Sequence, residues 1–158
     1  MIEKNHYTLI EDVLDFREVN TYDNMGNVIE NTIYDSRNTL HRRNIYSYDD
    51  KGNKLIENKY DAEGNLYENK HTYKYDDKGN VIEGNEFNAD GSLNQRYTNK
   101  YDEKGNEIEF NSFLSDGSLD VNGIYKYDYD KIGNWVKQAL LKDGVIPIDV
   151  TEREIEYY

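Results

Sequence analysis

Polar and apolar residues alternate along most of the chain, in segments of about 8–11 residues. In the segment that ends at Tyr101, for example, Leu93, Tyr97 and Tyr101 share one parity. A period of two is typical of a β-strand whose faces differ. No window carries an apolar stripe at the helical period of about 3.6 residues that is long enough for a helix. The pattern therefore predicts an all-β protein.

One recurring frame separates the alternating segments, and it reads aromatic-Asp-x-x-Gly-Asn/Ser-x-aliphatic. The hexapeptide YDDKGN occurs unchanged at Tyr48–Asn53 and at Tyr75–Asn80. Steps of 12 residues alternate with steps of 14 or 15, so the sequence is a repeat of about 26 residues with two half-units. The frames begin at Tyr22, Tyr34, Tyr48, Tyr60, Tyr75, Phe87, Tyr101, Phe113 and, loosened by two inserted residues, Tyr127.

The glycine of the frame indicates a left-handed backbone, because one copy replaces it with Asn38 and Asn tolerates positive φ best after Gly. Together with the Asp, this predicts a type I turn that ends in a G1 bulge. One extra residue in a later unit predicts a further bulge near Asn69–Thr72. The left-handed positions are Gly26, Gly52, Gly79, Gly105 and Gly133 in one half-unit, and Asn38, Gly64, Gly91, Gly117 and Gly144 in the other.

These reversals predict an antiparallel meander of about 11–12 strands, built from β-hairpin repeats in one curved sheet. We expect a single domain over residues 1–158, with a degenerate N-terminal unit at 1–21, regular repeats at 22–139 and a C-terminal cap at 140–158. The cap contains Pro147, the only proline, and a run of charges. Both features protect a sheet edge from further pairing.

Composition changes the expected core. Leu, Ile, Val and Phe make up only about 22% of the chain, close to the level of disordered sequences. The chain also has 16 tyrosines, however, and each ring can bury on the order of 150–250 Å². We therefore expect a thin, tyrosine-rich packing layer rather than a deep aliphatic core.

The net charge of −13 limits the partners. An acidic surface repels nucleic acid and anionic lipid, so we expect neither as a ligand. No apolar run approaches the roughly 18 residues of a transmembrane segment, and the chain has no cysteine. The first residues are too acidic for a signal peptide. The sequence thus predicts a cytoplasmic protein, or an extracellular or envelope protein if a targeting segment has been trimmed.

The frame Tyr-Asp-x-x-Gly-x-x-aliphatic, over about residues 20–146, resembles the YD repeat of the bacterial Rhs/YD family. Asn stands after Gly where that family usually has Arg, as at Asn53 and Asn80. The double period is also similar to the hairpin stacking of MORN-type repeats. The resemblance implies β-sheet shells and cell-surface or secreted modules, described as carbohydrate-binding or as toxin carriers.

Catalytic motifs are missing from the sequence. The histidines His6, His41 and His71 stand at different phases of the repeat, without zinc-ligand spacing. Acidic pairs such as Asp49/Asp50 recur once per repeat at the turn tips, where nothing desolvates them as a catalytic pair requires. We therefore predict no enzyme activity and no cofactor. Calcium shared between stacked acidic loops stays open as an alternative to plain turns.

Aromatic residues recur at the ends of equivalent strands and two to four residues earlier. Such a column is a stacking platform for a glycan or a protein if it is exposed, and it is the core if it is buried. The tryptophan breaks the repeat pattern and is either a cap or a contact anchor. The candidate binding residues are Tyr48, Tyr75, Tyr101, Tyr127, Tyr97, Tyr125 and Trp135.

Three functions are compatible with the sequence. The first is a non-enzymatic repeat module that binds a glycan or protein partner at a bacterial envelope or outside the cell. The second is an intracellular acidic immunity or inhibitor protein that neutralises a basic toxin, as the net charge of −13 suggests. The third is a structural spacer or assembly element.

Overall fold

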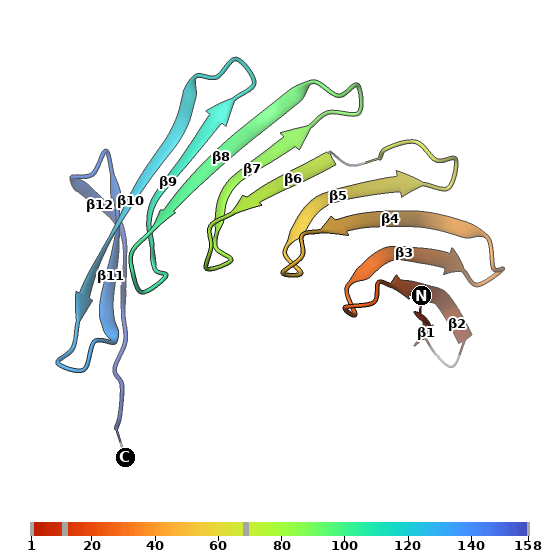
Figure 1. The fold of residues 1–158 in the computed structure, drawn as a ribbon, viewed down its shortest axis with the longest axis horizontal. Helices are drawn as coiled ribbons and strands as arrows, with labels where there is room; N and C mark the ends of the chain where they lie inside the picture. Colours follow the sequence, from red (N-terminus) through yellow and green to blue (C-terminus); the bar gives the residue numbers. More distant parts are fainter. Residues whose placement is uncertain (1, 11–12, 68–69, 158) are drawn as a thin grey trace. The chain divides into compact units, whose positions relative to one another are not determined.

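The computed structural model describes the backbone of residues 2–10, 13–67 and 70–157, and side chains from residue 16 onward within those ranges. Within these ranges all regular structure is β, and the strands are hydrogen-bonded in chain order (Figure 1). The predicted all-β antiparallel meander is confirmed. The strands are β1 (Ile2–Ile10), β2 (Val13–Tyr22), β3 (Val28–Asp35), β4 (Leu40–Tyr48), β5 (Lys54–Asp61), β6 (Lys70–Tyr75), β7 (Val81–Phe87), β8 (Leu93–Tyr101), β9 (Glu107–Leu114), β10 (Leu119–Tyr129), β11 (Trp135–Lys142) and β12 (Ile146–Glu152).

The chain divides into two compact units, Met1–Lys74 with Gly84–Asn94, and Tyr75–Glu83 with Gln95–Tyr158. In the first unit, each of β1 to β4 pairs antiparallel with the next strand, and β5 pairs antiparallel with β6. In the second unit, successive antiparallel pairs run from β8 to β12. Each unit is therefore a stack of hairpins.

The turns have the backbone that the repeat frame predicts. All ten predicted left-handed positions have positive φ, including Asn38 at 62°. The pairing register shifts by one residue directly before the turn, for example between Thr21 and Tyr22, as a G1 bulge requires. Asp143 is a further left-handed residue, with φ of 52°. The bulge predicted near Asn69–Thr72 falls partly outside the described residues and stays a prediction.

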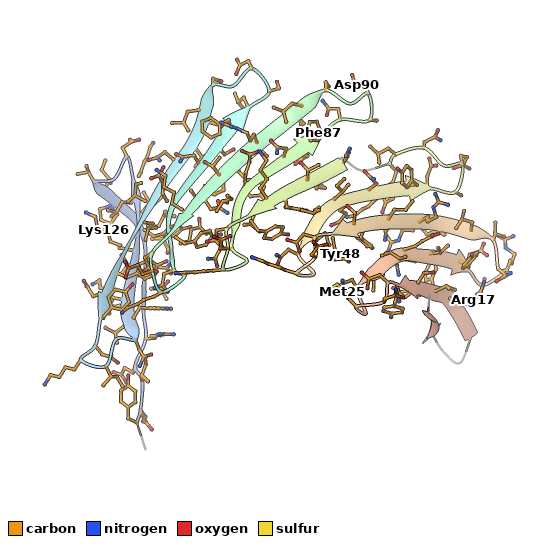
Figure 2. The ribbon with its side chains drawn as sticks, in the orientation of Figure 1. Arg17, Met25, Tyr48, Phe87, Asp90 and Lys126 are labelled. Atoms are coloured by element: carbon orange, nitrogen blue, oxygen red, sulfur yellow. The ribbon has the colours of Figure 1, made fainter. Side chains whose placement is uncertain are left out.

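Neither unit has a deep aliphatic core among its described residues. Leu141, which is 6% exposed, is the buried apolar side chain of that part of the chain. The other buried side chains are polar, such as Asn31, Asn44 and Ser112. Side chains project from the strands without a helix packing over them in the drawn part of the chain (Figure 2). The expected thin packing layer is confirmed.

Candidate functional site

The Asp of each frame holds its own turn together. One oxygen of the Asp23 carboxylate accepts the backbone N–H of Met25 at 2.9 Å and that of Asn27 at 2.8 Å. The other oxygen accepts the side-chain amide of Asn27 at 2.9 Å. This bond gives Asn a structural role after the glycine. The same amide bond joins Asp49 to Asn53, Asp61 to Asn65, Asp76 to Asn80, and Asp102 to Asn106.

The turn carboxylates are strongly acidic because of these bonds. The amide of Asn53 lowers the pKa of Asp49 below its ordinary value. At Asp102, burial acts to raise the pKa, but hydrogen bonds from Asn106 and Tyr129 outweigh it and lower the pKa to about 2. The carboxyl group of such an Asp is therefore ionised, and both of its oxygens already accept hydrogen bonds.

The tyrosine that precedes the turn has a recurrent structural partner. The hydroxyl of Tyr48 donates to the carbonyl oxygen of Val28 at 2.8 Å, and that of Tyr101 donates to Val81 at 3.0 Å (Tyr48 is labelled in Figure 2). In both cases the acceptor is the first residue after the previous turn on the same side. The repeated tyrosine thus ties one hairpin to the next.

Tyr127 makes the same bond, to the carbonyl oxygen of Glu107 at 2.8 Å, despite the two inserted residues. The insertion lengthens β10, so the turn itself begins at Asp130, and Tyr129 is the tyrosine that directly precedes it. The Tyr129 hydroxyl donates to the Asp102 carboxylate at 2.9 Å. The sequence contained the signal for this turn, since Tyr129–Asn134 reads YDKIGN, a full copy of the frame.

The other predicted aromatic residues are half-buried. Tyr97 lies 6.2 Å from Phe110 between ring centroids, and burial raises the pKa of both Tyr97 and Tyr125. The register places Tyr125 opposite Leu140. Tyr75 is also half-buried at the end of β6. The aromatic residues at the strand ends and those two to four residues earlier are thus neither fully buried nor fully exposed.

Trp135 lies at the start of β11 between two side chains. The Tyr127 ring meets it edge-on, with centroids 6.3 Å apart. The Arg153 guanidinium carbon lies 3.7 Å from the centre of the indole ring. Arg153 also donates from Nε to the Trp135 carbonyl oxygen at 2.6 Å, and from its backbone N–H to Val136 at 3.0 Å. The structure therefore assigns Trp135 a cationic neighbour that the sequence did not predict.

An open cavity of about 530 Å³ lies beside this arginine. Its charged lining is mixed, because Lys137 bonds to Glu152 at 2.7 Å. The lining residues are Asp128, Val136, Lys137, Glu152, Arg153 and Glu154.

Tyr157 is a further residue that the sequence analysis missed. Its hydroxyl donates to the Asp130 carboxylate and accepts the Asn134 amide at 2.9 Å. The hydrogen bond from Tyr157 lowers the pKa of Asp130. Tyr129 holds the previous turn in the same way. The available signal was that Tyr157 follows Tyr129 by 28 residues, the same distance by which Asp130 follows Asp102.

Three aromatic residues of the other half-unit, Tyr34, Tyr60 and Phe113, lie against arginine side chains. Each arginine precedes its aromatic partner by 17 residues, a spacing that the sequence analysis did not use. The distances from guanidinium carbon to ring centre are 4.4 Å for Arg17 on Tyr34, 5.8 Å for Arg43 on Tyr60 and 4.5 Å for Arg96 on Phe113.

Neither a metal cluster nor a membrane-spanning helix is found in the described ranges. No group of three or more His, Cys, Asp or Glu side chains there could hold a metal ion. No helix of that part of the chain is long and apolar enough to cross a membrane.

The comparisons with known proteins show similarity in fold. No family model and no curated protein matches the chain. Among solved structures, a chain of the Photorhabdus luminescens Tc holotoxin pore matches 81% of this chain with a TM-score of 0.53 and 11% identity. A TcdB2–TccC3 structure without its hypervariable C-terminal region matches 94%, with a TM-score of 0.46 and 15% identity. This chain spans about 9% of the length of each.

The holotoxin match defines the class of fold: this chain is a β-hairpin repeat module, similar in architecture to a small part of a much longer toxin-complex chain. That architecture agrees with the resemblance to YD/Rhs-type repeats.

Proposed function

We propose that the chain is a non-enzymatic repeat module that binds a protein partner within a larger assembly, at a bacterial envelope or outside the cell. The observation that carries the proposal is a set of large apolar side chains left exposed in the second unit. Leu119 and Val121 of β10 are 55% and 47% exposed, and Ile146 and Ile148 of β12 are both 59% exposed. Within each pair the two residues stand two positions apart on one strand, and neighbouring exposed apolar side chains of this size are typical of interaction sites.

The module's similarity in fold to a part of a toxin complex supports an assembly role. Turn carboxylates already engaged as hydrogen-bond acceptors, such as Asp49 and Asp76, support a structural rather than a catalytic use of the acidic repeats. The half-buried aromatic columns, with Tyr97 and Tyr125, are the surface that a glycan would use instead.

The net charge of −13 favours a second candidate, an inhibitor that neutralises a basic toxin. Such a complex loses association rate steeply as salt is added, whereas a complex that depends on apolar burial does not. The salt dependence of the association rate therefore separates the two functions.

Capture of partners from envelope and secreted fractions by the immobilised protein, in parallel with a glycan array, tests the proposal. We expect a discrete protein that Ile148→Glu no longer retains. Met25→Glu is the matched control, because Met25 is 61% exposed at a turn of the first unit and the substitution adds the same charge. The proposal is wrong if neither assay yields a binder, or if both variants retain the captured protein equally.

A further inference from the structure

Glu107 places a carboxyl group at a position of the repeat where other copies have an apolar side chain. It follows the turn asparagine at the start of β9, and the equivalent residues of two other copies are Val28 and Val81. In those copies the backbone carbonyl oxygen accepts a tyrosine hydroxyl, and the carbonyl oxygen of Glu107 accepts that of Tyr127 in the same way. The tie between hairpins thus uses only the backbone here, and a valine side chain is sufficient for it.

The Glu107 side chain lies on a face of the second unit that carries three tyrosines, Tyr101, Tyr125 and Tyr127. The register places Glu107 directly opposite Tyr101. The row of paired residues through Phe110 crosses β8, β9 and β10, and the period of two from this row puts all three tyrosines on the same face. Burial raises the pKa of each tyrosine, and the Glu107 carboxylate raises it further, so the carboxylate lies near all three hydroxyls.

This carboxyl group lacks a partner within the part of the chain that the structure describes. Glu107 is half-buried, and burial raises its pKa above the ordinary value, with no hydrogen bond or cation there to oppose the effect. Lys54, the equivalent residue of another copy, is also charged, but it bonds to Glu57 at 3.0 Å. A half-buried charge without a partner destabilises the folded state. Glu107 is therefore a residue that the fold itself does not need.

The surroundings of the Glu107 carboxylate favour a cation. The charged groups that act on Tyr125 are both carboxylates, those of Glu107 and Asp149. Tyrosine rings attract cations through the negative potential of their faces. Another ring of the same unit already holds one, because Lys104 Nζ lies 3.7 Å from the centre of the Tyr129 ring. Aromatic rings together with an unpaired carboxylate suit an ammonium or guanidinium group.

We propose that Glu107, with the rings of Tyr101, Tyr125 and Tyr127, binds a lysine or arginine side chain of the protein partner. The partner's cation supplies the charge that the carboxylate lacks, and the tyrosine rings pack against its aliphatic stem. Glu107 is thus kept at a cost in stability because it recognises the partner. The site names a chemistry for the partner of the proposed function and rests on that proposal.

The binding measurement is a titration with a synthetic Lys-Gly repeat peptide, followed by NMR of the protein with isotope-labelled tyrosine. The signals of Tyr101, Tyr125 and Tyr127 are identified from their Tyr→Phe variants, and we expect these signals to shift. The same peptide with norleucine in place of lysine keeps the stem without the charge, and it should not bind. Absence of Lys-Gly binding by the wild-type protein contradicts the site.

Glu107→Val tests the site in two directions at once. Valine is the residue of two other copies, so the variant should keep the fold, with a melting temperature equal to or above that of wild type. Peptide binding should nevertheless fall by about tenfold or more, because a charge-assisted contact is lost. A structural role for Glu107 predicts a lower melting temperature instead, and that result overturns the proposal.

Glu107→Gln and Glu109→Gln form a matched pair, because both remove one negative charge from β9. Glu109 lies opposite Lys100 in the register, one residue along from Tyr101 and hence on the other face, and it pairs with Lys100 at 2.8 Å. We expect Glu107→Gln to weaken peptide binding by about threefold or more, and Glu109→Gln to leave it unchanged. Equal weakening by both variants would reduce the effect to overall charge and refute the site.

The captured protein separates failure of the site from failure of the proposed function. A partner retained equally well by wild type and Glu107→Val refutes the site while the proposed function stands. Peptide binding that depends on Glu107, without any captured partner, refutes the function instead.

Discussion

Removing one tyrosine hydroxyl tests whether the repeated tyrosine is a structural tie between hairpins. Tyr127→Phe keeps the ring but deletes the bond to the Glu107 carbonyl oxygen at 2.8 Å, and the bond that the Tyr127 hydroxyl accepts from Gln138 at 3.0 Å. Each bond contributes about 0.5–1.5 kcal/mol net, and partners left without a bond add to the cost. Because the Tyr127 side chain and its two partners are half-buried, we expect a loss of about 1–2 kcal/mol in the free energy of unfolding.

Tyr101→Phe provides a graded comparison. Its acceptor, the carbonyl oxygen of Val81, also accepts the Asn99 amide at 2.9 Å and therefore keeps one partner. We expect a smaller loss, about 0.5–1 kcal/mol. Tyr67→Phe, at a residue that is 41% exposed, is the control and should change stability by less than about 0.5 kcal/mol.

Urea unfolding followed by circular dichroism measures these differences, with the m-value as a check that the unfolding transition is unchanged. The expected order of destabilisation is Tyr127→Phe, then Tyr101→Phe, then Tyr67→Phe. Equal stability of all three variants would refute the structural tie. The same variants also distinguish a structural role of these tyrosines from a ligand-stacking role. Phenylalanine keeps the ring face that a stacked ligand would need, so a stacking role alone would leave the stability unchanged.

Three further measurements follow from the turns. Gly64→Ala should lower the free energy of unfolding by about 1–2 kcal/mol, because alanine is strained at a φ of +86°. Gly52→Ala should lower it further, because the new Cβ would also lie 3.3 Å from the Asn27 side chain. Thermal melts of the two variants measure the difference. The pKa of Asp102 is lowered from 3.8 to about 2 in the folded protein, so its stabilising contribution is complete above the unfolded value and is lost as pH falls from about 4 to 2. Melting temperatures measured across that range should fall less steeply for Asp102→Asn than for wild type, and parallel curves would contradict the assignment. Millimolar Ca²⁺ or EDTA should leave the melting temperature unchanged, since the turn carboxylates already accept hydrogen bonds; a clear upward shift with Ca²⁺ would instead establish the calcium alternative.

The sequence by itself determined the strands and the turns. A period of two identifies a strand because successive side chains point to opposite faces, and this depends on the chain's own geometry. The left-handed turn position was readable for a similar reason: only Gly and a few residues such as Asn38 adopt it without strain, so the substitution reports the backbone. The frame at Tyr129–Asn134 was also local and was available to the same reasoning.

The contacts that define the candidate site were decided by the tertiary structure. Arg153 meets Trp135 across 18 residues of sequence, and Tyr157 meets Asp130 across 27. Which residues face each other at such separations depends on the length of every intervening strand and on each bulge, because one residue of slip moves a side chain to the opposite face. Residue types alone leave that register open, so Trp135 could be recognised as unusual from the sequence, while its cationic neighbour could be found only in the folded chain.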